Sequence, residues 1–195
     1  MGFFDLVRAG TSQSVQAAIS NGAHVNAQNS YDKTPLMYAA MYNQNPEVIT
    51  ALLAAGADIK ARDILGGTAL MLAAENNQNP EVISTLMKAG ADTNARTKDG
   101  MTALMLATAN NQNLEVISTL LKAGADINAR NKNGWTPLME AAMYNQNPEV
   151  IKTLLAAGAD TKAKDNARKT AFNYAQTRAK LKGTDAYRQL QEASQ

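Results

Sequence analysis

Apolar residues occur along the chain in pairs of short segments that have helical spacing. In residues 34–67, Leu36, Ala39 and Ala40 fall on one side of a helix. A second stripe follows shortly after and consists of Val48, Ile49, Leu52 and Leu53. The residues between this stripe and the next unit have turn composition with short extended pieces. The pattern predicts two short helices followed by a projecting turn.

Polar residues at the ends of these stripes predict where each helix begins and ends. Thr34 and Asn45 are suitable N-caps, and each is followed by a proline at the first helical position. Glu47 lies where a negative charge favours the positive end of the helix dipole. Asn43 is expected to end the first helix in a left-handed conformation, and Gly56 to end the second in the same way.

This unit recurs with a constant period of 34 residues. The four-residue motif Thr-Pro-Leu-Met or a close variant begins at Thr34, Thr68, Thr102, Thr136 and Thr170. A Gly-Ala pair keeps the same step at Gly22, Gly56, Gly90, Gly124 and Gly158. Such self-similarity is the signature of a solenoid, in which each unit buries its apolar face against its neighbours.

The full motif closely resembles the ankyrin repeat over nearly the whole chain. It reads Thr-Pro-Leu-Met-x-Ala-Ala, followed by Leu-Leu-x-Ala-Gly-Ala-Asp-x-x-Ala-Arg. Tetratricopeptide repeats share the period, but their spaced aromatic and glycine pattern is absent. The resemblance implies an all-α solenoid of stacked helix-loop-helix units with projecting β-turns. The repeat resembled is a 34-residue variant, as in a bacterial-like sequence or an engineered, consensus-like array.

Two departures from the family pattern affect the expected contacts. Met37, Met71, Met105 and Met139 stand where the family usually has histidine, so the usual Thr–His hydrogen bond is expected to be absent. The repeat is also one residue longer than usual, because an Asn-Gln-Asn tract separates the two helices. These tracts begin at Asn43, Asn77, Asn111 and Asn145. We interpret them as caps that also bond the next loop, with a ladder of stacked amides as the alternative.

The repeats predict a single array across residues 1–195. Full repeats are expected at 34–67, 68–101, 102–135 and 136–169. Residues 1–33 align with the second half of a repeat and carry extra polar residues, as an N-terminal cap should. Residues 170–195 begin like a repeat and continue as a polar helix, which predicts a C-terminal cap.

Composition narrows the class of protein. The chain carries 19 basic and 17 acidic residues, and this near-balance argues against a polybasic nucleic-acid binder. Hydrophobic residues make up 45% of the chain, yet no apolar run is long enough to cross a bilayer. The absence of cysteine excludes a disulfide scaffold and cysteine-ligated zinc. We expect a cytoplasmic monomer without membrane contact, with a removed signal sequence as the alternative.

No constellation of residues indicates catalysis, a cofactor or a metal. His24 is the single histidine, and it stands where the other repeats have a turn aspartate. Glu47 and its equivalents recur once per unit, too far apart for a two-carboxylate site. Asp58 and its equivalents are expected to brace the turns. The chain is therefore predicted not to be an enzyme.

The positions at which the repeats differ predict a binding surface. In the ankyrin family, partners usually contact the turn tips and the concave face of the first helices. Tyrosine and tryptophan, which are enriched in binding hot spots, gather at such positions here. The predicted partner-binding residues are Tyr31, Tyr38, Met41, Tyr42, Ile64, Leu65, Leu72, Glu75, Asn76, Met101, Leu106, Asn110, Trp135, Glu140, Met143 and Tyr144.

The function that follows is a non-catalytic scaffold that binds a protein or peptide on its concave face and turn tips. Two alternatives stay open. One is an engineered stable array without a natural partner. The other is contact with phosphates or nucleic acid through the basic C-terminal residues Lys162, Lys164, Arg168, Lys169, Arg178, Lys180, Lys182 and Arg188. Ile64, Leu65 and Trp135 also have structural interpretations, as side chains that pack on a neighbouring turn.

Overall fold

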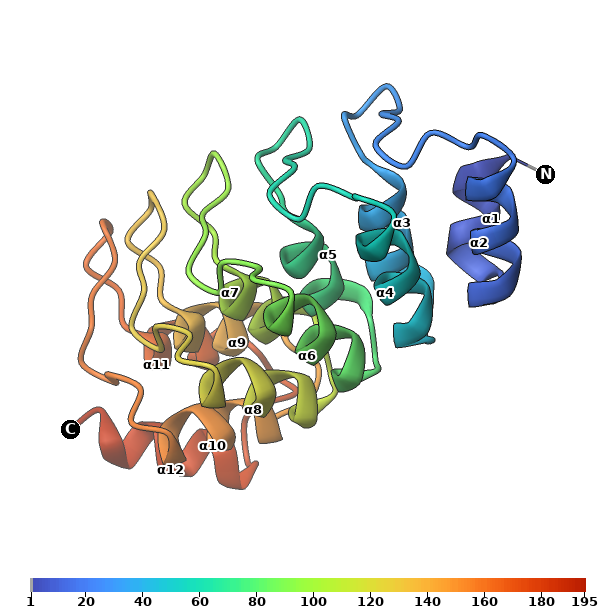
Figure 1. Cartoon of the computed structure of the whole chain (residues 1–195). Helices are drawn as coiled ribbons and strands as arrows, with labels where there is room; N and C mark the ends of the chain where they lie inside the picture. The colour runs from blue at the N-terminus through green and yellow to red at the C-terminus, as the bar shows by residue number, and fades with distance from the viewer. Residues whose placement is uncertain (1) are drawn as a thin grey trace.

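The computed structural model describes residues 2–195, and within that range it contains twelve α-helices and no strand (Figure 1). The helices are α1 (Phe3–Ala9), α2 (Ser12–Ser20), α3 (Pro35–Tyr42), α4 (Pro46–Ala54), α5 (Ala69–Asn76), α6 (Pro80–Lys88), α7 (Ala103–Asn110), α8 (Leu114–Lys122), α9 (Pro137–Tyr144), α10 (Glu149–Ala156), α11 (Ala171–Gln176) and α12 (Asp185–Ala193). The all-α expectation is confirmed.

The helices form two parallel rows. The odd-numbered helices contact one another in order from α1 to α11, and the even-numbered helices do so from α2 to α12. The loops that follow the even-numbered helices all project on the same side of the array, as Figure 1 shows. Each unit packs mainly on its neighbours, which is the arrangement of a solenoid.

The predicted caps account for most helix ends. The Thr34 side chain accepts a hydrogen bond from the Met37 backbone N–H at 3.4 Å, and Asn45 accepts one from Glu47 at 2.9 Å. Gly56 has φ of +89°, a left-handed conformation that a side chain would strain, so it ends α4 as expected. The Thr34 N–H donates to the Met37 sulfur, with the nitrogen and sulfur 3.5 Å apart.

The expected role of Asn43 is wrong in one respect. Asn43 is extended, with φ −86° and ψ 123°, and so it ends α3 without entering the left-handed region. Its side chain acts instead between units: the amide Nδ2 donates to the carbonyls of Val7 and Gly10, each at 3.0 Å. Its Oδ1 accepts from the Asn45 N–H at 2.9 Å. One buried side chain therefore satisfies three backbone groups.

The same contact is repeated along the whole array. Asn77 and Asn111 are each fully buried and donate to two carbonyls of the preceding unit at 2.8–2.9 Å. Asn145 repeats the pattern, and the Arg178 guanidinium then donates to the Asn145 carbonyl at 2.6 Å. We call this series the asparagine relay. It consists of amide-to-backbone bonds, not of the amide ladder that was the alternative.

The turns are also joined, through single backbone hydrogen bonds at their tips. The Ile64 N–H donates to the Tyr31 carbonyl at 3.0 Å, and Lys98 donates to Leu65 at 2.9 Å. The same contact recurs in the next two turns. At the base of the turns, the Arg62 and Arg96 guanidinium groups each donate to a carbonyl of the following repeat. Neighbouring turns are thus held in register without forming a sheet.

The structure has one helix more at its N-terminal end than the sequence predicted. Residues 1–33 align with the second half of a repeat, but α1 supplies a first helix too, and it packs on α3. Its short sequence lacks the Thr-Pro-Leu motif, which is why the repeat pattern did not reveal it. At the other end, α12 is the polar helix expected there, with Ala186 and Leu190 buried against the array.

The core follows the space between the two rows. Its largest fully buried side chains come from Leu, Ile and Met positions that recur in every full repeat. Within residues 2–195, no helix combines the length and the apolar character needed to cross a bilayer.

Candidate binding face

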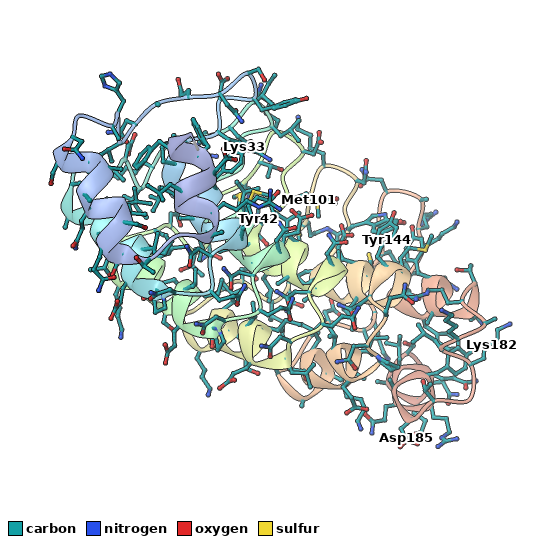
Figure 2. All side chains as sticks on the ribbon, turned by 90° about the vertical axis from the view of Figure 1, so that its right-hand side faces the viewer. Lys33, Tyr42, Met101, Tyr144, Lys182 and Asp185 are labelled. Atoms are coloured by element: carbon teal, nitrogen blue, oxygen red, sulfur yellow. The ribbon has the colours of Figure 1, made fainter. Side chains whose placement is uncertain are left out.

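The odd-numbered helices and the adjoining sides of the turns form one continuous surface, which we call the inner face. Figure 2 shows Lys33, Tyr42, Met101 and Tyr144 in order along this side, whereas Lys182 and Asp185 lie at the C-terminal end. In residues 2–195, five large apolar side chains are exposed, and all five are predicted partner-binding residues. They are Tyr31 (61% exposed), Tyr42 (42%), Ile64 (47%), Leu65 (67%) and Tyr144 (50%).

The other predicted residues differ in how much surface they offer. Asn76 and Asn110 are exposed. Intermediate exposure is shared by Tyr38, Met41, Glu75, Met101, Leu106, Trp135 and Met143. Leu72 is only 7% exposed and Glu140 only 4%, so most of each side chain is covered by the chain itself. Ile64 and Leu65 are exposed at the turn tip.

An N-terminal aromatic cluster consists of Phe4, Tyr38 and Tyr42. The Phe4 and Tyr38 rings meet edge to face with centroids 5.0 Å apart, and Tyr42 lies 6.0 Å from Tyr38. The Arg8 guanidinium lies 4.8 Å from the centre of the Tyr42 ring. Asn29 donates to the Tyr38 hydroxyl at 3.0 Å. The cluster therefore contains its own cation–π contact.

A C-terminal aromatic cluster consists of Trp135, Tyr144 and Tyr174. Trp135 is stacked near Tyr144 with centroids 5.8 Å apart and touches Tyr174 at 4.4 Å. Trp135 thus combines a packing role with partial exposure on the inner face. Its ring contacts reach Tyr144 on α9 and Tyr174 on α11.

Tyr174 rests on a buried carboxylate. Its hydroxyl donates to Asp165, which is 6% exposed. Burial raises the pKa of Asp165, but hydrogen bonds from Tyr174 and from the backbone of Lys169 and Ala167 outweigh it, so the pKa is lowered overall. Burial and the hydrogen bond to Asp165 raise the pKa of Tyr174 to about 12. Asp165 is therefore a charged anchor for the last turn.

Glu140 is the second buried carboxyl group of this region, and its surroundings are different. Asn131 donates to Glu140 Oε1 at 3.2 Å, and no other hydrogen bond from residues 2–195 reaches the carboxyl group. Desolvation by burial raises the pKa of Glu140 to about 7. The side chain lines an open hollow of about 420 Å³ together with Asp99, Met101, Lys132, Trp135 and Tyr144. We call it the Glu140 hollow.

The middle of the inner face is polar. Asn110 on α7 donates to Glu75 Oε1 on α5 at 3.1 Å, and Asn76 donates to the Leu72 carbonyl at 2.9 Å. Burial raises the pKa of Glu75, although the hydrogen bond from Asn76 partly opposes this shift. The inner face therefore has two aromatic ends that are separated by an amide- and carboxylate-bearing centre.

The family model for ankyrin repeats matches the chain in three segments, residues 4–63, 45–131 and 70–165, which together span most of its length. The chain belongs to the ankyrin-repeat family. A comparison with curated proteins found no significant match. Ankyrin repeats are generally modules for protein–protein interaction rather than enzymes.

The turn acids of these ankyrin repeats brace the backbone, as predicted. Asp58 Oδ1 accepts from the Lys60 N–H at 2.8 Å, and Asp92, Asp126 and Asp160 make the same contact. His24 stands at the equivalent place in the first turn. Within residues 2–195, no group of three His, Cys, Asp or Glu side chains is arranged to hold a metal ion.

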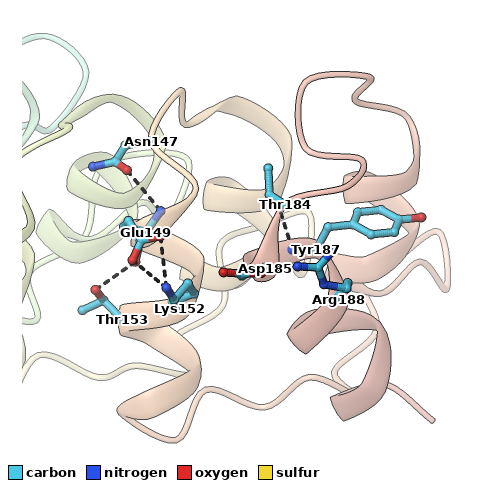
Figure 3. A network of polar contacts seen from close by, with 8 residues as sticks. All are labelled: Asn147, Glu149, Lys152, Thr153, Thr184, Asp185, Tyr187 and Arg188. Atoms are coloured by element: carbon cyan, nitrogen blue, oxygen red, sulfur yellow. Dashed lines mark hydrogen bonds and ion pairs between the residues drawn. The ribbon is translucent and has the colours of Figure 1, made fainter.

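The polar contacts at the C-terminal end of the ankyrin array lie on and beside α10 and α12, in the row of even-numbered helices (Figure 3). On α10, Glu149 pairs with Lys152 at 2.9 Å, and its hydrogen bond and charge raise the pKa of Lys152. On α12, Arg188 pairs with Asp185. Two of the eight basic residues considered for phosphate contact, Arg178 and Arg188, are therefore already bonded within the chain.

Several residues of the inner face were not among the predicted set. Phe4 and Arg8 were missed because α1 was not recognised. Asn29 and Asn131 were missed because their side chains point from the turn to a residue nine positions later, on the following helix. The signal was available in part, since an asparagine or aspartate followed at nine residues by tyrosine or glutamate occurs in three repeats, ending with Asp165 and Tyr174.

Proposed function

We propose that the chain is a non-catalytic binding module that holds a segment of another protein on its inner face. The observation that supports this proposal is the distribution of exposed apolar surface. All five exposed large apolar side chains of residues 2–195 lie on the inner face or the turn tips. Large exposed aromatic groups bury area at a low cost in side-chain entropy, so they are effective contacts for a partner.

The scaffold supports the same function because it is preorganised. The asparagine relay and the turn-to-turn hydrogen bonds fix each unit on the one before it. A partner that binds such a face does not have to order it first, so less of the interaction free energy is lost on association. A stiff face with aromatic ends favours an extended peptide segment that contacts several repeats.

Peptides selected from a random linear library displayed on phage provide the test. The variant Tyr42→Ala with Tyr144→Ala removes one ring from each aromatic end. We expect selected peptides to bind it at least about tenfold more weakly than the wild type, because each tyrosine is a candidate hot spot. Both side chains are about half exposed, so the melting temperature should change little.

The matched control is Lys88→Ala with Lys122→Ala, which changes two exposed residues in the last turns of α6 and α8 on the opposite row. It should leave peptide affinity unchanged. Equal affinity of the tyrosine variant and the wild type would place binding elsewhere. A failure to select any peptide would instead favour the array without a natural partner.

A further inference from the structure

The Glu140 hollow contains a carboxylate oxygen that has no hydrogen-bond partner among residues 2–195. Every fully buried side-chain polar atom in residues 2–195 has a hydrogen-bond partner. Glu140 Oε2 has none, so it is the atom that remains open to the hollow. The ion pairs of the described residues are Lys152–Glu149 and Arg188–Asp185, so no lysine or arginine among them neutralises Glu140.

The side chains at the base of the hollow differ from those at the equivalent place in the N-terminal repeat. Glu140 occupies the position of Tyr38, and Asn131 occupies that of Asn29. In the N-terminal repeat, the asparagine donates to a tyrosine hydroxyl, and the tyrosine ring packs against Phe4. In the C-terminal repeat, the same donor holds a shorter, acidic side chain. The substitution replaces an aromatic ring with an acceptor at the base of an open space.

The aromatic side of the hollow also lacks a group that its N-terminal equivalent has. Tyr144 occupies the position of Tyr42, whose ring is covered by Arg8. The residue equivalent to Arg8 is Asn110, and its amide donates to Glu75. The Tyr144 ring therefore receives no cation from the preceding helix. Arg8 demonstrates within this molecule that a guanidinium group packs on a tyrosine at this position.

We propose that the Glu140 hollow receives an arginine side chain of a peptide segment bound along the inner face. The proposal rests on the proposed function and specifies the chemistry of its partner. The guanidinium group would lie against the Trp135 and Tyr144 rings while its N–H groups donate to Glu140 Oε2. Asp99 and Lys132 are both exposed and line the hollow as well, so their opposite charges offset each other and Glu140 supplies the unbalanced charge.

Arginine fits this site better than lysine does. A guanidinium group is planar, stacks on aromatic rings and presents several donors in one plane. A lysine ammonium is a compact and strongly hydrated charge, so more hydration is lost when it enters a partly buried site. A neutral side chain of the same shape would leave Glu140 without a counter-charge.

The test uses the single tryptophan of the chain as a reporter. Trp135 lines the hollow, so its indole N–H signal in a ¹H–¹⁵N NMR spectrum should shift when the site is occupied. The probes are N-acetyl-arginine amide and N-acetyl-citrulline amide, which have the same shape but differ in charge. We expect saturable shifts with the arginine probe, in the millimolar range for so small a ligand, and none with the citrulline probe.

Two carboxyl variants provide the matched controls. Glu140→Gln keeps the shape and the Asn131 contact but removes the charge, and it should weaken the arginine probe about tenfold. Glu115→Gln removes an exposed carboxyl group in the first turn of α8, on the opposite row of helices, and should leave the probe's affinity unchanged. The comparison of the two probes on the wild type requires no variant, so it remains decisive even if Glu140→Gln fails to fold.

Equal shifts with both probes, no shift with arginine, or unchanged binding to Glu140→Gln would each overturn the arginine site. Those results would leave the proposed function intact if selected peptides still lost affinity in the tyrosine variant. If the arginine probe binds Glu140→Gln weakly while selected peptides bind the tyrosine variant as tightly as the wild type, the arginine site is real but the peptides bind elsewhere than on the inner face.

Discussion

The two aromatic clusters occupy equivalent places in their repeats and yet offer different surfaces. At the N-terminal end, Arg8 covers Tyr42, and the Tyr38 hydroxyl is held by Asn29. At the C-terminal end, Tyr144 lacks an equivalent cation, and Glu140 replaces the ring of Tyr38. The backbone positions are the same, so a few side chains decide whether a repeat closes its own surface or leaves it open.

The same asparagine contact lies beneath both clusters. Its loss is expected to have the largest effect on stability. Asn43→Ala and Asn145→Ala each remove a buried amide that satisfies three backbone groups. Each should lower the free energy of unfolding by about 3 kcal/mol, because buried backbone groups lose their partners. Urea denaturation would measure both losses.

The neighbouring glutamines are exposed and provide controls for these asparagines. Gln44→Ala and Gln146→Ala should each change stability by no more than about 0.5 kcal/mol. A large difference between the losses at Asn43 and Asn145 would show that the two ends do not rest on equivalent scaffolds.

The second prediction concerns how the stability of the chain depends on pH at Glu140 and at Tyr38, which occupy equivalent positions in their repeats. The pKa of Glu140 is raised to about 7 in the folded chain, so the native state keeps a proton that the unfolded state releases near pH 4.5. The contribution of Glu140 to the free energy of unfolding is therefore most favourable at low pH, and it decreases as the pH rises from about 4.5 to 7. Glu140→Gln should stabilise the chain by about 2–3 kcal/mol at pH 8 and by almost nothing at pH 4.

Tyr38→Phe is the matched change at the N-terminal position. It removes a neutral hydrogen bond from Asn29 and should cost about 1 kcal/mol at both pH values. Thermal melts at pH 4 and pH 8 distinguish the two variants. A stabilisation by Glu140→Gln that does not vary with pH would contradict a buried, desolvated carboxyl group.

The third prediction has the smallest expected effect and concerns a variant that gives Tyr144 the cation that Tyr42 has. Asn110→Arg places a guanidinium group where Arg8 stands relative to Tyr42. It is combined with Glu75→Gln, because the Glu75 carboxylate would otherwise hold the new cation. The double variant should bind the N-acetyl-arginine amide probe about fivefold more weakly than Glu75→Gln alone, which corresponds to about 1 kcal/mol of cation–π contact. Equal binding to both would mean that Tyr144 is not part of the arginine site.

The sequence predicted the parts of this molecule that depend on local chemistry. The period of 34, the Thr34 and Asn45 caps and the left-handed Gly56 each follow from a residue and its immediate neighbours. The exposed members of the inner face were also found, because positions that differ between otherwise similar repeats lie outside the packed core.

Contacts between units were predicted less well. The role of Asn43 depends on which carbonyls of the preceding unit face its amide, and a repeat period does not supply that geometry. Glu140 was chosen as a variable position, but its burial depends on the packing of the Trp135 ring and the Asn131 side chain around it. Arg8 was missed because it lies on a helix that lacks the repeat motif.

The asparagine relay runs in one direction along the array and ends at Arg178. Each amide reaches back toward the N-terminus, and at the far end the Arg178 guanidinium takes the final carbonyl in place of another asparagine. Additional 34-residue copies inserted between the full repeats would continue the relay, whereas extension beyond Arg178 would require that residue to be replaced. The inner face could be lengthened in this way without a change to either terminal cap.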